Sequence, residues 1–220
     1  MKKKITSFVL LALISISCKS QSERVYPTCP DDHHPHLIDL GLPSGTKWAC
    51  CNVDDDHSKQ SPTNYGCYYA WGETEGKKEY NWSTYIHYDG SSDTCHDLGS
   101  DIAGTQYDVA HVKWGGSWQM PTKEQFSELI AICTYEWIRE NGVRGVRLTN
   151  KKKGTSIFLP AAGNRWSKDL NDAGSEGGYL SSTLYPSSSY GACSLYFGSG
   201  YVRWGYYCRY GGFTVRPVSR

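Results

Sequence analysis

The stretch PTKEQFSELIAIC, residues 121–133, carries the strongest structural signal in the chain. Thr122 can cap a helix, and Gln125, three residues later, can return the hydrogen bond in a capping box. Apolar side chains then recur at helical spacing, at Phe126, Leu129, Ile130 and Cys133. We therefore expect a helix over residues 123–132 that lays one apolar face on a sheet.

Strand signals follow this helix. Asn141 and Gly142 mark a tight turn between apolar segments at residues 135–138 and 143–148, which is a hairpin signal. After a further turn, residues 157–159 (IFL) are all apolar, as expected for a buried strand. These patterns predict antiparallel strands after the helix.

Weaker strand signals lie elsewhere in the chain. Residues 37–48 are short apolar runs broken by Gly, Pro and Ser, which predicts strand, turn and strand. Residues 68–71 (YYAW) predict a short aromatic strand, and residues 73–109 a long polar loop region. The final GGFTVRPV predicts a strand that ends at Pro217. Together the patterns favour one mixed α and β domain.

The N-terminus has the layout of a secretory signal. Three lysines precede an apolar run that is too short to span a bilayer, so we expect residues 1–17 to be a signal peptide. Cys18 follows in a lipobox-like context, although Ser15 stands where Leu is usual, so we expect lipidation of Cys18; plain cleavage is the alternative. Residues 18–36 then form a polar tether, and residues 37–220 the domain. This predicts a surface-exposed outer-membrane lipoprotein that contacts the membrane through its anchor.

The charge balance argues against nucleic acid as a partner. The formal net charge of the whole chain is +1, and removal of the three lysines of the signal leaves the mature chain nearly neutral. No basic stripe remains to neutralise phosphates.

Cysteine usage and the tether raise the questions of disulfides and metals. In an oxidising envelope compartment an even number of cysteines makes disulfides the default, with the pairing open. Eight cysteines remain in the mature chain: Cys29, Cys50, Cys51, Cys67, Cys95, Cys133, Cys193 and Cys208. An acidic and imidazole cluster lies in the tether, at Asp31, Asp32, His33, His34 and His36. A solvated linker explains that cluster, and we assign no metal and no cofactor.

The last third of the chain is rich in residues that suit a binding surface. Eight tyrosines and seven serines lie between Tyr179 and Gly212. Tyr supplies stiff, amphipathic contacts, and Ser and Gly supply adaptable hydrogen bonding and shape. We expect a ligand face for a glycan or a protein, formed by Tyr185, Ser187, Ser189, Tyr190, Tyr201, Arg203, Tyr206, Tyr207, Arg209 and Tyr210. The alternative is that many of these rings simply pave a sheet.

Five segments in order resemble the hallmark segments of the Fibrobacter succinogenes major paralogous domain family, a group of exported bacterial proteins. They are LIDLGLPSGTKWA, YYAWGET, DVAHVKWGGSWQMPT, IFLPAAGNR and GGFTVRPV, which span nearly all of residues 37–218. QMPTKEQF and GGFTVR are also similar to segments of formylglycine-generating enzymes. The resemblance implies an α+β, C-type lectin-like domain: a small twisted, mostly antiparallel sheet with one or two helices and long loops.

The resemblance raises two activities that the residues do not support. The enzymatic branch uses a copper-binding cysteine pair, whereas the flanks of Cys193 and Cys208 do not resemble that site. The tripeptides of calcium-dependent sugar binding are also absent. His87, His96 and His111 are possible general bases, but each has neighbours that can satisfy a structural imidazole. We assign no catalytic residue.

We therefore expect a non-catalytic surface lipoprotein that binds a ligand through its C-terminal face. A structural or assembly lipoprotein is the first alternative, and a formylglycine-generating-enzyme-like oxidoreductase is the second. Some targets of diversity-generating retroelements resemble this fold, so the Tyr- and Ser-rich segment is also a possible variable region.

Overall fold

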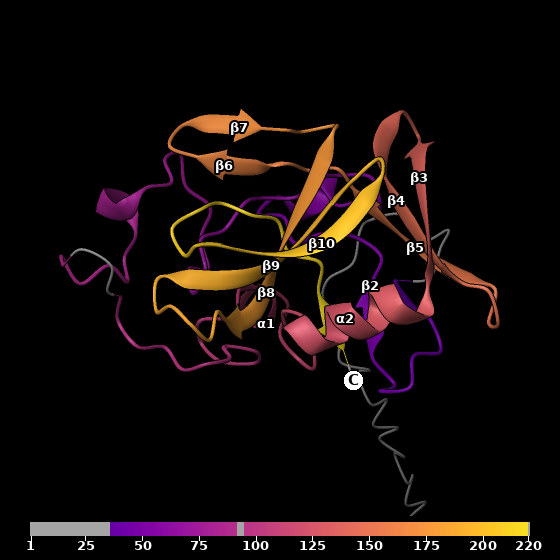
Figure 1. The fold of residues 1–220 in the computed structure, drawn as a ribbon, viewed down its shortest axis with the longest axis horizontal. Coiled ribbons are helices and arrows are strands. Elements are labelled where there is room, and N and C mark those ends of the chain that lie inside the picture. The colour runs from indigo at the N-terminus through magenta and orange to yellow at the C-terminus, as the bar shows by residue number, and fades with distance from the viewer. Residues whose placement is uncertain (1–35, 92–94, 220) are drawn as a thin grey trace, which may run out of the picture.

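The computed structural model describes residues 36–91 and 95–219, which form an α+β fold of small, mostly antiparallel sheets with two α-helices (Figure 1). The helices are α1 (Val109–Trp114) and α2 (Lys123–Ile132), with single 3-10 turns at His57–Lys59 and Trp82–Thr84. The strands are β1 (Leu37–Asp39), β2 (Lys47–Ala49), β3 (Thr134–Glu140), β4 (Val143–Asn150), β5 (Thr155–Pro160), β6 (Asn164–Trp166), β7 (Asp169–Asn171), β8 (Glu176–Leu184), β9 (Gly191–Gly198), β10 (Tyr201–Cys208) and β11 (Val218–Ser219). None of the helices described is long and apolar enough to cross a bilayer.

The predicted helix and the hairpin after it are confirmed. In α2 the Thr122 hydroxyl accepts from the backbone N–H of Gln125, and the Gln125 side chain accepts from the N–H of Thr122, which is the expected capping box. β3 and β4 pair through a two-residue turn at Asn141 and Gly142, both at positive φ. β5 then pairs with β4, as the apolar segment before Ala161 predicted.

The C-terminal third forms a separate three-stranded sheet in the order β10-β9-β8. β9 lies in the middle and is buried at all of its positions. β8 carries an irregularity between Leu180 and Leu184, whereas the ladder between β9 and β10 runs in register from Tyr201 to Cys208. Because β9 pairs with both other strands and β10 pairs with β9 alone, β10 lies at an edge of this sheet.

Two expectations for the strands need correction. Residues 68–71 form no strand: Tyr69 exchanges two backbone hydrogen bonds with Phe213, while the next bond, from Trp71, goes to Arg209. The predicted C-terminal strand does not end at Pro217, because β11 begins immediately after it and pairs with β2. At Tyr69 and Phe213 an isolated bridge therefore replaces the predicted strand pairing, whereas β11 forms a short ladder with β2.

The region predicted as loop ends in a helix that the sequence did not reveal. Asp108 caps α1 by accepting from the N–H groups of Ala110 and His111, and its other oxygen accepts from Gly104 and Met120. Burial raises the pKa of Asp108, against four backbone donors that lower it. One carboxylate therefore holds the start of α1 and the approach to α2 together.

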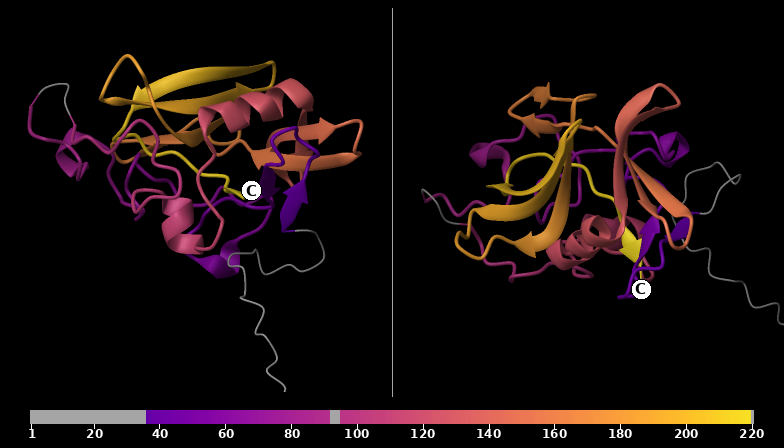
Figure 2. Two further views of the ribbon diagram at one scale, coloured as in Figure 1. Left: turned by 90° about the horizontal axis from the view of Figure 1, so that it is seen from below. Right: turned by 45° about the vertical axis from the view of Figure 1, so that its right-hand side comes forward.

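The core lies between α2 and the two larger sheets. Phe126 and Leu129 of α2 belong to one buried cluster with residues of β4, β5 and β9, and α2 contacts β4, β8 and β9. A second cluster surrounds Trp71, Trp114 and Trp118 beside α1. In both views of Figure 2 the C-terminal end lies beside the first strands, as the pairing of β11 with β2 requires.

A fully buried arginine joins the two ends of the domain. Arg216 Nε donates to Asn52 Oδ1 at 2.7 Å, and Nη1 donates to the carbonyls of Ala49 at 3.1 Å and Cys50 at 2.6 Å. Asn52 in turn donates to the hydroxyl of Tyr179 at 3.2 Å. A charged donor group thus satisfies three acceptors that are far apart from it in the sequence.

We expect Arg216→Met to lower the free energy of unfolding by about 3 kcal/mol or more, because it leaves buried acceptors without donors. Urea unfolding followed by tryptophan fluorescence measures the change. Arg203→Met, on the exposed side of β10, is the matched control and should change stability by less than about 0.5 kcal/mol. Equal effects of the two substitutions would show that Arg216 has no special structural role.

Candidate functional site

The predicted ligand residues lie on β10, on the loop of residues 185–190 before β9, and on the turn after β10. No position of β10 is buried, in contrast to β9 beside it. The sheet order makes β10 an edge strand. Any ligand of this region therefore approaches an edge rather than the middle of a sheet.

One group of predicted residues lies on the face of β10 that turns toward the β6–β7 hairpin. Tyr201, Arg203 and Tyr207 alternate along the strand and share this face. The Arg203 guanidinium is 5.1 Å from the centre of the Tyr201 ring. Tyr207 stacks on the buried Tyr196 with ring centres 4.5 Å apart, so it is half core and half surface.

A second group lies on the opposite face. Tyr206 is 54% exposed and stacks on Tyr185, with ring centres 4.0 Å apart and an interplanar angle of 8°. Ser187 and Ser189 are exposed, and Tyr190 is half-buried, on the loop beside this pair. The structure therefore splits the predicted residues between two faces, and a single flat patch is not formed.

The assignment of Arg209 to the ligand face is wrong. Its side chain is only 2% exposed and lies over the Trp71 ring at 4.5 Å. Nε donates to the hydroxyl of Tyr85 at 2.8 Å, and Nη1 donates to the carbonyls of His96 and Ser189, each at 3.1 Å. Arg209 is a structural residue that ties the loop before β9 to the segment around Tyr85.

Tyr210 belongs to an aromatic cluster whose other members sequence reasoning missed. Its ring is 4.6 Å from that of Trp82 and 5.3 Å from that of Trp166, both half-buried. Trp166 also lies 6.2 Å from Tyr207. The cluster joins a 3-10 turn, β6 and the end of β10, and no local sequence signal brings these segments together.

The outer edge of β10 has free backbone groups. The N–H of Arg209 donates to the carbonyl of Tyr190 at 2.8 Å, in the same register as the pairing of β10 with β9. Backbone groups of alternate residues point to opposite neighbours in an antiparallel sheet, so the odd-numbered residues of β10 are the ones that hydrogen-bond to β9. The N–H and C=O groups of Val202, Trp204 and Tyr206 therefore point away from β9. Among the described residues no other strand pairs with this edge.

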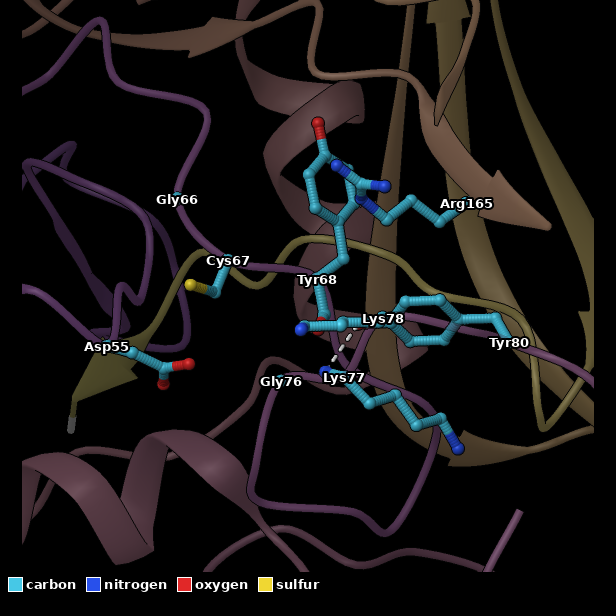
Figure 3. Close-up of a pocket in the computed structure, with 9 residues that line it drawn as sticks. All are labelled: Asp55, Gly66, Cys67, Tyr68, Gly76, Lys77, Lys78, Tyr80 and Arg165. Carbon is cyan, nitrogen blue, oxygen red and sulfur yellow. Dashed lines mark hydrogen bonds between the residues drawn. The ribbon is translucent and has the colours of Figure 1, made fainter. Parts of the chain in front are cut away.

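A separate hollow of about 490 Å³ lies on the other side of β6 (Figure 3). In Figure 3, Asp55 and Cys67 lie on one side of it, and Arg165, Tyr68 and Tyr80 on the other. The full lining is Asp55, Gly66, Cys67, Tyr68, Gly76, Lys77, Lys78, Tyr80 and Arg165. Its volume falls within the range of roughly 300–1,000 Å³ that is usual for small-ligand sites.

The charged groups of the hollow differ in how far they are satisfied. Lys77 Nζ lies 2.7 Å from a Glu73 oxygen and also donates to the carbonyl of Thr84 at 3.0 Å. The Arg165 guanidinium lies 5.1 Å from the Tyr68 ring centre and has no ion pair with any described residue. Lys78 is exposed and likewise unpaired within the described part of the chain. Two of the three cations are thus available.

Asp55 is the acidic group of the hollow. Lys113 Nζ lies 2.9 Å from Asp55 Oδ1, and the Tyr69 hydroxyl donates to the same atom at 3.0 Å. Burial disfavours the charged form, but these donors outweigh it and hold the pKa of Asp55 below its usual value. Asp55 is therefore ionised at neutral pH and keeps one oxygen for further contacts.

Four of the described thiols lie in surroundings that favour the protonated form. Cys67, Cys95, Cys133 and Cys193 are free, so the expected disulfide framework does not include them. Burial raises the pKa of Cys67 and of Cys133 to about 11 each. It also raises the pKa of Cys193. These environments do not favour the thiolate that nucleophilic or metal chemistry requires.

Two of the three histidines considered as bases contact backbone carbonyls through their rings. His87 Nε2 lies 3.0 Å from the carbonyl of Gly72, and His111 Nδ1 lies 3.3 Å from that of Trp118. Within residues 36–91 and 95–219 no group of three or more potential metal ligands comes together. The predicted signal peptide, Cys18 and residues 31–35 of the acidic and imidazole cluster lie outside the described residues.

Comparison with known proteins gives no assignment: no protein-family model, no curated protein and no solved structure matches the chain.

Arg209 and Arg203 provide a direct check of this site description. We expect Arg209→Gln to lower the unfolding free energy by about 2–4 kcal/mol, because its carbonyl and hydroxyl partners lose a buried charged donor. Arg203→Gln should leave stability within about 0.5 kcal/mol. Thermal unfolding followed by circular dichroism measures both, and a stable Arg209→Gln protein would contradict the structural role.

Proposed function

We propose that this protein is a non-catalytic binding protein of the cell envelope whose ligand is an extended polypeptide segment that adds to the free edge of β10. The observation that carries the proposal is an open strand edge with accessible aromatic rings on both faces. An added strand alternates its side chains between the two faces of a sheet. It would contact Tyr206 on one face and Tyr201 on the other, so an added strand can use the tyrosines on both faces of β10.

The composition of β10 supports this mode of binding. Proteins usually protect free edges with proline, lysine, bulges or very short strands. β10 is eight residues long, pairs with β9 without a bulge, and contains one charged residue, Arg203. Tyrosine anchors lose little conformational entropy on binding. A long unprotected edge of this kind favours a receptor over a structural or assembly lipoprotein, which needs no ligand.

A glycan is the second candidate ligand, on a different observation. Trp82 and Trp166 are half-buried rings that both contact the half-buried ring of Tyr210, and such rings can stack on sugar faces. This surface lies at the end of β10 rather than along its edge. A glycan ligand would therefore depend on Trp166 and not on the backbone of β10.

An oxidoreductase function like that of formylglycine-generating enzymes has less support. Cys193 is paired with Tyr206 in the ladder, and Cys208 lies two positions along on the same face, so the two cysteines are diagonal neighbours roughly 7–8 Å apart. Burial raises the pKa of Cys193, so the copper-binding thiolate pair is disfavoured.

We also propose that the domain is C-type lectin-like and belongs to the Fibrobacter succinogenes major paralogous domain family. The resembling segments occupy structural positions, which supports it. LIDLGLPSGTKWA contributes the buried Leu40, Leu42 and Trp48, and QMPT leads into α2. The C-terminal segment is buried from Gly211 to Ser219.

The site of action follows from the N-terminal residues. We place the protein at the outer membrane, held by a lipid on Cys18, with the domain facing outward. The polar residues of the tether give the reach that a membrane-bound receptor needs.

A proline in β10 tests the edge. Val202→Pro removes an outward N–H without touching the ladder to β9, a position where proline is tolerated. Peptides selected on the native protein from a displayed library should bind this variant at least about tenfold more weakly, through a lost hydrogen bond and a ring in the path of the new ladder. Biolayer interferometry measures the affinities.

Val202→Thr is the matched control, because it keeps the N–H and should bind the same peptides as the native protein does. Peptides that bind Val202→Pro unchanged would exclude the edge. A glycan array whose signals depend on Trp166 but not on Val202 would establish the sugar alternative. Absence of any ligand in both screens would favour the structural lipoprotein.

Cys18→Ser tests the anchor. Without the acylated cysteine we expect the protein to move from the membrane fraction to the soluble fraction, because the described part of the chain offers no membrane-spanning helix. Fractionation and immunoblotting measure the distribution, and an unchanged membrane fraction would rule out lipid anchoring.

A further inference from the structure

We propose that the hollow in Figure 3 is a second binding site, for a small carboxylate that also carries a hydrogen-bond donor such as a hydroxyl or ammonium group. The proposal does not depend on the edge of β10, because none of the residues of that strand lines the hollow.

Arg165 is the residue that would bind the carboxylate of the ligand. Its guanidinium is held against the Tyr68 ring, and Tyr68 is itself held by its hydroxyl, which donates to the carbonyl of Ala162 at 2.5 Å. A half-buried cation without an acidic partner among the described residues is costly unless something charged pairs with it. A planar guanidinium binds a carboxylate through two parallel hydrogen bonds, which suits this position.

Lys78 supplies a second positive charge from the loop that borders the hollow. In Figure 3 its side chain extends between the Arg165 side and the Asp55 side. The neighbouring Lys77 cannot serve in this way, because Glu73 and the carbonyl of Thr84 bind its ammonium group. Two adjacent lysines therefore have different roles, one structural and one available.

Asp55 narrows the class of ligand. Because Lys113 offsets its charge, Asp55 selects chiefly for a hydrogen-bond donor, a hydroxyl or ammonium group, which sulfate lacks and dianionic phosphate offers only once. Cys67 and Tyr80 add no further charge, since burial raises their pKa values to about 11 and 12. A monovalent carboxylate with a donor at its other end, such as an acidic sugar or an amino acid, satisfies both ends.

The walls give the site a rigid shape. The Tyr80 hydroxyl donates to the carbonyl of Tyr68, and the N–H of Lys77 donates to the Tyr80 hydroxyl at 3.2 Å. The two tyrosines and the loop of Lys77 are thus one hydrogen-bonded unit. A pre-formed wall lowers the entropy cost of ordering the site when a ligand binds.

Titration of the mature protein with glucuronate, glutamate, glucose and inorganic phosphate, followed by NMR chemical shifts, tests the site. We expect saturable binding of glucuronate or glutamate, with shifts at Tyr68 and Arg165, and tighter binding than that of phosphate or glucose. Arg165→Gln should weaken the binding at least tenfold, and Lys78→Gln at least threefold. Lys168→Gln, an exposed lysine of the turn after β6, is the control and should change nothing.

Lys78 is a surface residue, so its variant keeps the test valid if Arg165→Gln does not fold. Phosphate binding as tight as that of either carboxylate, or carboxylate binding that is indifferent to both Arg165→Gln and Lys78→Gln, would overturn the proposal. Absence of saturable binding to both carboxylates would also overturn it. Val202→Pro should leave this binding unchanged, so failure here is distinguishable from failure of the proposed edge site.

Discussion

The fold depends on a buried guanidinium, that of Arg216, which has no acidic partner among the described residues. Arg216 bonds to the carbonyls of Ala49 and Cys50 and to the Asn52 side chain, while Asn52 also contacts the hydroxyl of Tyr179. These groups come from the end of β2 and the segment after it, from β8 and from the C-terminal segment. Because an unsatisfied buried charge costs far more than a hydrogen bond gains, the network tolerates few alternative arrangements. The network therefore ties the two ends of the domain together.

The closed core determines how β10 is presented. Tyr179 of β8 is fully buried, and its hydroxyl also donates to the carbonyl of Pro160, while β9 lies between β8 and β10 and packs against α2. β10 comes last in this order and has only β9 to pair with. Its side chains alternate between the α2 face and the β6 face, and its outward backbone groups stay free. An edge with rings on both faces is thus a consequence of sheet order rather than of the tyrosine content alone.

Local signals made part of this structure predictable. The capping box of Thr122 and Gln125 and the Asn141-Gly142 turn each lie within a few residues, so α2 and the β3–β4 hairpin follow from sequence. The placement of the tyrosines on two faces of β10 does not follow from sequence, because it depends on which residues of β10 hydrogen-bond to β9 and on which strand lies at the edge. Arg203 and Arg209 have the same chemistry six residues apart, yet one is exposed and the other is covered by segments from elsewhere in the chain. The partners of Tyr210 and the hollow beside Arg165 come from equally distant segments.

The short strand β6 separates the two candidate sites by its alternation. Arg165 lies over Tyr68 in the hollow, while the next residue, Trp166, contacts Tyr207, Tyr210 and Phe213 on the other side. The hollow is polar and charged, and suits a small ion that needs directed hydrogen bonds. The β10 side is aromatic and nearly uncharged, and suits a larger partner that contributes backbone bonds and apolar contacts. The alternation of this three-residue strand therefore keeps the cation Arg165 on the side of the hollow and the aromatic Trp166 on the side of β10, so the two proposed ligands would meet different chemistry.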